Sequence, residues 1–170
     1  DVKSGAPGNN VVQVVADAIL NDIDPMRSCL VFAKELTTDK DANDGYLYSS
    51  EIYNQKINAD LVILTACETG GGLYKEGEGM MSLSYSFEYA GCKSAIMSLW
   101  PIDEKAASDI TANFYKHVAR GESTSDALYH AKKDFLSSAD GSLVNPFYWS
   151  GLVLLGQNEK IQLEDKSGLA

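Results

Sequence analysis

The chain has 170 residues, with 14 Lys+Arg against 24 Asp+Glu and a formal net charge of −10. This length fits one domain, and 45% apolar with 22% charged residues excludes a disordered or fibrous chain. The acid excess argues against a nucleic-acid or anionic-membrane partner, because phosphate binding needs clustered Lys and Arg. No apolar run approaches the ~18 residues of a membrane span and no signal peptide opens the chain, so we expect a cytoplasmic protein. The first residue is Asp1 rather than Met, which indicates a piece of something longer.

The first third of the chain predicts short strands separated by polar loops. Residues 1–10 are rich in Gly, Pro and Asn, and we expect a flexible lead-in. The β-branched run at 11–16 predicts a buried strand, and the apolar run at 29–33 predicts a second one. Polar residues at 37–45 predict a surface loop, and 46–54 form an element of undetermined type.

The middle of the chain alternates strands with helices. Residues 61–66 are apolar almost throughout, which is typical of a strand covered on both faces. Glycines follow, and 80–90 then predict a helix with apolar residues on one face. The buried run at 93–99 predicts a strand, and 103–120 predict an amphipathic helix that Gly121 ends.

The last third predicts one more helix and one more strand. Ser123 begins a helix running to about 136, and 147–155 form a final strand-like run. Residues 157–170 are expected to be a polar tail, which leaves 11–156 as the folded domain. Strands that alternate with helices predict an α/β fold with a mostly parallel sheet.

The cysteines Cys29, Cys67 and Cys92 are scattered along the chain. An odd count without close spacing argues against a disulfide framework. The sequence contains no C-x-x-C motif and no closely spaced pair of histidines that would predict a zinc site. The default for each cysteine is a buried small hydrophobic residue. We therefore expect no metal and no cofactor.

Cys67 is the one cysteine whose neighbours in the sequence favour a catalytic role. It follows the strongest strand, at the carboxyl end where ligands bind in open parallel sheets. Glu68 follows at once, and Gly70 begins a glycine-rich loop whose backbone N–H groups suit an oxyanion. The alternative is a buried cysteine before a sharp glycine turn.

Four spaced motifs follow one another along the chain: Thr65-Ala66-Cys67-Glu68-Thr69-Gly70, Gly77-Glu78-Gly79, Ser98-Leu99-Trp100-Pro101, and Pro146-Phe147-Tyr148-Trp149 with Leu154-Leu155-Gly156. Together they closely resemble the CHAT domain, a caspase-like domain related to separases and caspases and often found behind TPR repeats in bacteria. The resemblance covers residues 11–156. It implies a caspase-like three-layer α/β/α sandwich and, in active members, a Cys–His dyad peptidase with Cys67 as nucleophile.

The position of the family's general-base histidine is different in this chain. In the family, that histidine ends the first strand, and here Asp17 occupies its place, while Gln13 replaces an earlier histidine. A further family histidine, before the Pro-x-Tyr-Trp segment, is Asn145. The resemblance thus gives Cys67 and Asp17 as the catalytic positions, with the dyad histidine missing.

A carboxylate in place of the imidazole is unfavourable for catalysis. A neutral thiol becomes a good nucleophile when an imidazole takes its proton and stays beside it as a cation. The negative charge of Asp17 disfavours the thiolate of Cys67 and raises the thiol pKa. Neither His117 nor His130 is expected to substitute, because both follow Cys67 on predicted helices, whereas the dyad needs a base at the carboxyl end of the neighbouring strand. We expect His117 to interact with the helix dipole or to face solvent, and His130 to lie at the surface or the core edge.

The candidate substrate-binding residues are Glu68, Gly70, Trp100 and Asp103. In caspase-like peptidases the segment after the strand ending at Trp100 lines the pocket for the P1 side chain. Acids at Asp103 and Glu104 suit a basic P1 residue. They also suit the start of a helix, where acids stabilise the dipole, and Trp100 equally suits a core or groove wall.

The sequence is compatible with three hypotheses about function. The first is a bacterial CHAT-type pseudo-peptidase that binds a protein or peptide and works with other domains of its parent chain. The second is an active cysteine endopeptidase whose base comes from elsewhere, or whose Asp17 was introduced to silence it. The third is a generic α/β ligand-binding domain.

Overall fold

A computed structural model describes residues 11–14, 17–19, 28–31, 45–65 and 78–161 as a mixed α/β fold. Its strands are β1 (Val11–Val14), β2 (Asp17–Ile19), β3 (Cys29–Val31), β4 (Tyr46–Tyr48), β5 (Leu61–Leu64), β6 (Ser94–Ser98) and β7 (Leu152–Gly156). Its α-helices are α1 (Ser49–Tyr53), α2 (Glu78–Tyr89), α3 (Glu104–Ala119) and α4 (Thr124–Ser138). Two 3₁₀ turns, η2 (Gly141–Val144) and η3 (Pro146–Tyr148), join α4 to β7.

The central sheet has the strand order β1-β5-β6-β7. β1 and β6 are both parallel to β5, whereas β7 is antiparallel to β6. The sheet is therefore mixed, and the expectation of a mostly parallel sheet holds only for its first three strands. The antiparallel strand follows from connectivity, because β7 enters from the 3₁₀ turns at the carboxyl end of β6 and runs back beside it.

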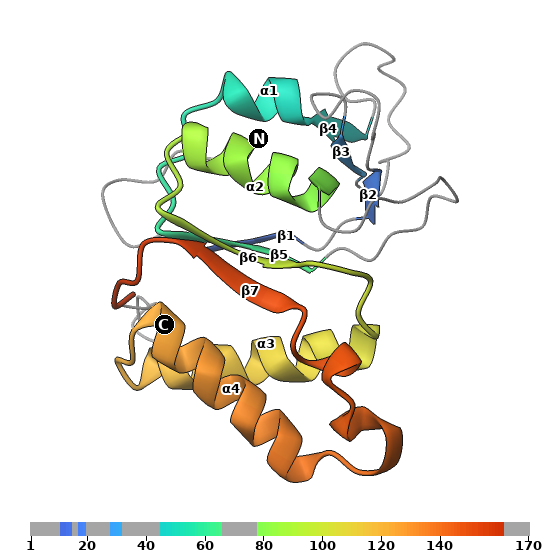
Figure 1. Ribbon diagram of the computed structural model, residues 1–170. Helices are drawn as coiled ribbons and strands as arrows, with labels where there is room; N and C mark the ends of the chain where they lie inside the picture. The colour runs from blue at the N-terminus through green and yellow to red at the C-terminus, as the bar shows by residue number, and fades with distance from the viewer. Residues whose placement is uncertain (1–10, 15–16, 20–27, 32–44, 66–77, 162–170) are drawn as a thin grey trace, which may run out of the picture.

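The sheet lies between two layers of helices, with α1 and α2 above it and α3 and α4 below it in the view of Figure 1. Successive residues of β5 point to opposite faces, as in any strand. Leu64 is buried in the cluster under α1 and α2, and Ile63 is buried in the cluster against α3 and α4. All four residues of β5 are buried, which confirms the prediction of a strand covered on both faces.

A second, three-stranded sheet has the order β2-β3-β4 and is antiparallel throughout. It lies on the same side of the central sheet as α1 and α2 (Figure 1). The segment of undetermined type at 46–54 resolves into β4 followed by α1.

The first predicted strand, at 11–16, is confirmed over Val11–Val14, which form β1, while residues 15–16 lie outside the described residues. The next described residue, Asp17, is the first of β2. Asp17 pairs with Val31 of β3, so the chain has left the central sheet by that point. The β-branched run thus predicts the extended backbone of Val11–Val14 correctly.

The final predicted strand begins later than expected. Residues 147–155 were expected to be strand-like, but the first part is η3 and only Leu152–Gly156 form β7. Pro146 stands in the first turn of η3, where its missing N–H costs nothing. The Asn145 side chain accepts a hydrogen bond from the Phe147 backbone N–H at 3.0 Å, which favours a turn over a strand.

No helix within the described parts of the chain is both long and apolar enough to cross a membrane.

Candidate functional site

The carboxyl ends of β1 and β5 lie side by side at one edge of the central sheet. The strands are parallel, and Val14 at the end of β1 pairs with Leu64 at the end of β5. Asp17 follows Val14 by three positions, just as Cys67 follows Leu64 by three positions. This edge is where ligands bind in open parallel sheets. The two candidate catalytic residues thus follow neighbouring strands at matching points of the register.

Three of the predicted site residues, Cys67, Glu68 and Gly70, lie outside the described residues. Their expected roles as nucleophile and substrate-binding groups stay predictions. Asp17 is the first residue of β2, and its place in the register is the structural information that bears on it.

Trp100 follows β6 and is held by the segment that precedes β7. Its indole Nε1 donates a hydrogen bond to the Phe147 carbonyl at 2.9 Å, and the two rings stack with centroids 6.2 Å apart. A Cβ on Gly151 would lie 2.7 Å from the indole, so only glycine lets the chain pass there. Trp100 is partly exposed, at the carboxyl end of the central sheet.

Asp103 caps the amino terminus of α3. Its carboxylate accepts a hydrogen bond from the Ala106 backbone N–H at 3.0 Å, and Glu104 stands in the first turn. Both acids therefore lie where the helix dipole favours negative charge. Asp103 has this structural role whether or not it also contacts a substrate.

Cys29 and Cys92 are buried thiols, as expected for small hydrophobic residues. Burial raises the pKa of the Cys92 thiol to about 11, against a smaller lowering by a backbone hydrogen bond at Ala59. The Cys92 thiol also lies 3.7 Å from the Ile57 carbonyl. Neither cysteine suits a nucleophile, because the reactive form is an accessible thiolate.

The chain's two histidines, His117 and His130, meet between α3 and α4. His117 is buried, although interaction with the helix dipole or a solvent-facing position was expected. Its Nδ1 lies 2.8 Å from Glu122 Oε1 and its Nε2 lies 2.9 Å from Asp134 Oδ2. His130 Nδ1 lies 2.6 Å from Glu122 Oε2.

These contacts shift two pKa values in opposite directions. The hydrogen bond to Glu122 raises the pKa of His117, and the hydrogen bond to Asp134 raises it further. Together they outweigh the lowering of this pKa by burial. Hydrogen bonds from His130 and His117 lower the pKa of Glu122. His117, Glu122 and His130 have ligand atoms within 4.8 Å of one another, a spacing at which they could hold a metal ion.

Sequence reasoning missed this cluster because no short motif contains both histidines. One indication was present, since Gly121 ends one predicted helix and Ser123 begins the next. A turn this short makes the two helices antiparallel neighbours, so the last turn of one meets the first turns of the other.

The histidines lie away from the carboxyl edge of β1 and β5. α3 begins just after the carboxyl end of β6 and packs along the sheet on its way back (Figure 1). From Glu104 to His117 the helix rises about 20 Å at 1.5 Å per residue. His117 and its partner His130 therefore lie toward the opposite edge of the sheet.

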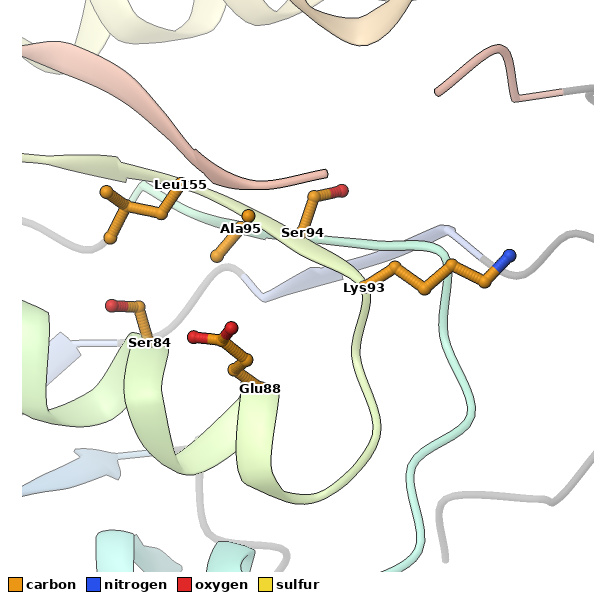
Figure 2. Close-up of a pocket in the computed structure, with 7 residues that line it drawn as sticks. Ser84, Glu88, Lys93, Ser94, Ala95 and Leu155 are labelled. Carbon is orange, nitrogen blue, oxygen red and sulfur yellow. The ribbon is translucent and has the colours of Figure 1, made fainter. Parts of the chain in front are cut away.

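A small pocket lies at the amino end of β6, as Figure 2 shows; it is lined by Ser84, Glu88, Lys93, Ser94, Ala95, Leu155 and Gly156. Its volume of about 10 Å³ has room for about one water molecule. The Lys93 side chain extends away from it and pairs with Asp60 at 2.8 Å. This pocket is too small for a peptide side chain.

The mixed sheet between two helical layers, with a cysteine after its second strand, is the arrangement expected of a CHAT domain. Residues 2–157 match the family described as CHAT domain, and the chain belongs to this family. Tetratricopeptide repeat protein 28 of Mus musculus is 26% identical over 115 residues, covering 68% of this chain and 5% of that protein. The Homo sapiens protein of the same name is 26% identical over 140 residues, covering 75% of this chain and 6% of that protein.

The chain thus spans about one-twentieth of the length of the curated relatives it matches. Both relatives carry tetratricopeptide repeats in their names, in line with the expected association of this domain with TPR repeats. Both are mammalian, so the bacterial source implied by the resemblance stays a prediction.

Proposed function

We propose that this CHAT domain is a catalytically impaired, caspase-like module that binds a protein or peptide as part of a longer protein. The observation that carries the proposal is the position of its histidines. The sequence contains two, and both take part in the cluster between α3 and α4. Neither is available at the carboxyl edge of β1 and β5, where a dyad base is needed.

The register of the central sheet supports the assignment of Asp17 to the base position. Asp17 and Cys67 follow the paired residues Val14 and Leu64 by the same number of positions. Val14 and Leu64 are paired at the ends of parallel strands, so the segments leading to Asp17 and to Cys67 both start from the same edge of the central sheet. A carboxylate in that place opposes formation of the thiolate and gives no imidazolium to protonate a leaving amine.

The relatives support a role within a multidomain protein. The chain matches only 5% to 6% of their length, and their names record tetratricopeptide repeats. We infer that other domains of the parent chain are the first partners of this module, and that a peptide bound at the carboxyl edge is recognised without being cleaved.

The alternative function is an active cysteine endopeptidase that uses Cys67. Its supporting observation is the retained cysteine at the end of β5, followed by Glu68 and the glycine-rich loop. This alternative needs a base from another part of the parent protein or from a partner.

The test compares the wild-type chain with Asp17→His, using a thiol-reactive peptide electrophile and mass spectrometry to locate the labelled cysteine. We expect Cys67 to react slowly in the wild type and faster by at least ~10-fold in Asp17→His near pH 7, since an adjacent imidazole activates a thiol. Asp17→Asn is the matched control, because it removes the negative charge without adding a base. Rapid labelling of wild-type Cys67 together with cleavage of a peptide library would contradict the proposal.

A further inference from the structure

The cluster between α3 and α4 places four ionisable side chains on three adjoining segments. His117 lies in the last turns of α3, Glu122 in the connecting turn, and His130 and Asp134 on α4. The Gly121 and Glu122 backbone N–H groups hydrogen-bond to the Val118 and His117 carbonyls at 2.9 and 3.3 Å, which fixes the turn. The side chains thus start from well-held backbone, as a ligand-binding site requires.

The contacts of His117 have the form found around metal-bound histidines. A histidine that binds a metal through one nitrogen donates its other N–H to a carboxylate, which fixes the ring and its tautomer. Asp134 is in that place, since its Oδ2 lies 2.9 Å from His117 Nε2. With the other proton held at Nε2, loss of the Nδ1 proton to solvent frees a lone pair on His117 Nδ1, which lies 2.8 Å from Glu122 Oε1.

The chemistry of these donors selects the kind of ion. Two imidazole nitrogens and a carboxylate oxygen suit a borderline divalent ion, whereas Ca²⁺ and Mg²⁺ prefer oxygen alone. A His₂Glu set with one further position is a known ligand set for Zn²⁺. Glu122 and His130 are partly exposed, so the fourth position of a tetrahedral ion is accessible to water.

We propose that His117 Nδ1, His130 Nδ1 and one oxygen of Glu122 bind Zn²⁺, with Asp134 as a positioning residue that orients His117. Tetrahedral bonds of about 2.0–2.1 Å place ligand atoms roughly 3.4 Å apart. The donor atoms now lie between the 2.6 Å contact of His130 with Glu122 and the 4.8 Å limit of the cluster. Binding therefore needs the 2.8 Å and 2.6 Å contacts of the two imidazoles with Glu122 to lengthen.

This site is independent of the proposed pseudo-peptidase function, because it lies away from the carboxyl edge of β1 and β5. It would join the end of α3 to α4 through an ion.

The first experiment measures Zn²⁺ binding to the chelator-treated chain by calorimetry and follows the histidine ring resonances by NMR. The sequence contains two histidines, so both ring signals can be assigned by two single substitutions. We expect one Zn²⁺ per chain and large shifts of both rings together. Co²⁺ should give visible bands without a thiolate charge-transfer band, because none of the cysteines is a ligand. No binding, a shift of only one ring, or a thiolate band would overturn the proposal.

The second experiment uses variants that separate ligands from their surroundings. His130→Ala removes a partly exposed ligand and should weaken Zn²⁺ binding by at least ~100-fold, whereas Asp134→Asn should cost about 10-fold to 100-fold. Asp109→Asn, two turns before His117 on α3, is the matched control and should bind as the wild type does. Circular dichroism of each variant without metal shows whether it folds. Undiminished binding by a folded His130→Ala would overturn the site.

Discussion

Asp103 caps α3 by accepting a hydrogen bond from the Ala106 N–H, and it is also a predicted substrate-binding residue. Two substitutions distinguish these roles. Asp103→Ala removes the cap of α3, and we expect it to lower the free energy of unfolding by about 1 kcal/mol. Asp103→Asn keeps an acceptor at the same place and should cost a small part of that. Urea unfolding of both variants checks this, and equal losses would contradict the capping role. Weaker peptide binding by Asp103→Asn at unchanged stability would instead assign Asp103 to substrate recognition.

Burial of Cys92 has a direct consequence for labelling experiments. With a pKa of about 11, roughly one Cys92 in a thousand is a thiolate at pH 8, and the group is also shielded from solvent. We expect native protein to leave Cys29 and Cys92 unmodified by iodoacetamide, and unfolded protein to be modified at all three cysteines. Peptide mapping checks this. Modification of Cys92 in the native state at a rate near that of a free thiol would contradict the buried position.

At the residue scale, the sequence predicted single contacts well only where they are local. The cap at Asp103 and the burial of Cys29 and Cys92 follow from neighbours along the chain or from residue type. The His117 cluster did not, because its partners are brought in by the turn and by α4. A residue's partners across two helices depend on how those helices rotate against each other, which one sequence does not specify.

At the element scale, the elements with strong periodicity or clear caps were predicted closely. α3 and α4 begin after Asp103 and Ser123 as expected, because both caps are visible in the sequence. The first strand is confirmed over Val11–Val14, whereas the last strand was predicted too long, since an apolar run also fits a 3₁₀ turn. The expectation that Cys67 lies at the carboxyl edge came from its place directly after a predicted strand, whereas the expectation that Asp17 lies beside it came from the resemblance.

The close approach of Gly151 to Trp100 gives a test of the segment that leads into β7. Gly151→Ala would place a methyl group 2.7 Å from the indole, so we expect a loss of roughly 1–3 kcal/mol in the free energy of unfolding. Trp100→Phe removes the ring atoms involved, and Gly151→Ala should cost less in that background. Urea unfolding of the four proteins forms a double-mutant cycle. Additive losses would show that the two positions do not touch.

At the scale of the whole molecule, one sheet is shared by two cores. Leu64 and Ile63 are neighbours in β5, yet they belong to the clusters on opposite faces. We expect Leu64→Ala and Ile63→Ala each to cost about 2–5 kcal/mol, with one unfolding transition in both cases. Tryptophan fluorescence reports the α3 and α4 side, where Trp100 and Trp149 pack, and circular dichroism reports all helices. Separate midpoints by the two probes in Leu64→Ala would show that the layers unfold independently.

The central claim is that the domain keeps the nucleophile position but lacks a base beside it. The most direct measurement is the alkylation rate of wild-type Cys67 between about pH 6 and 9, followed by peptide mapping. Because the expected neighbour is a carboxylate rather than an imidazole, we predict a rate that rises with an apparent pKa of about 8.5 or higher. An apparent pKa well below 8.5, with fast labelling near pH 7, would show an activated thiolate and contradict the account.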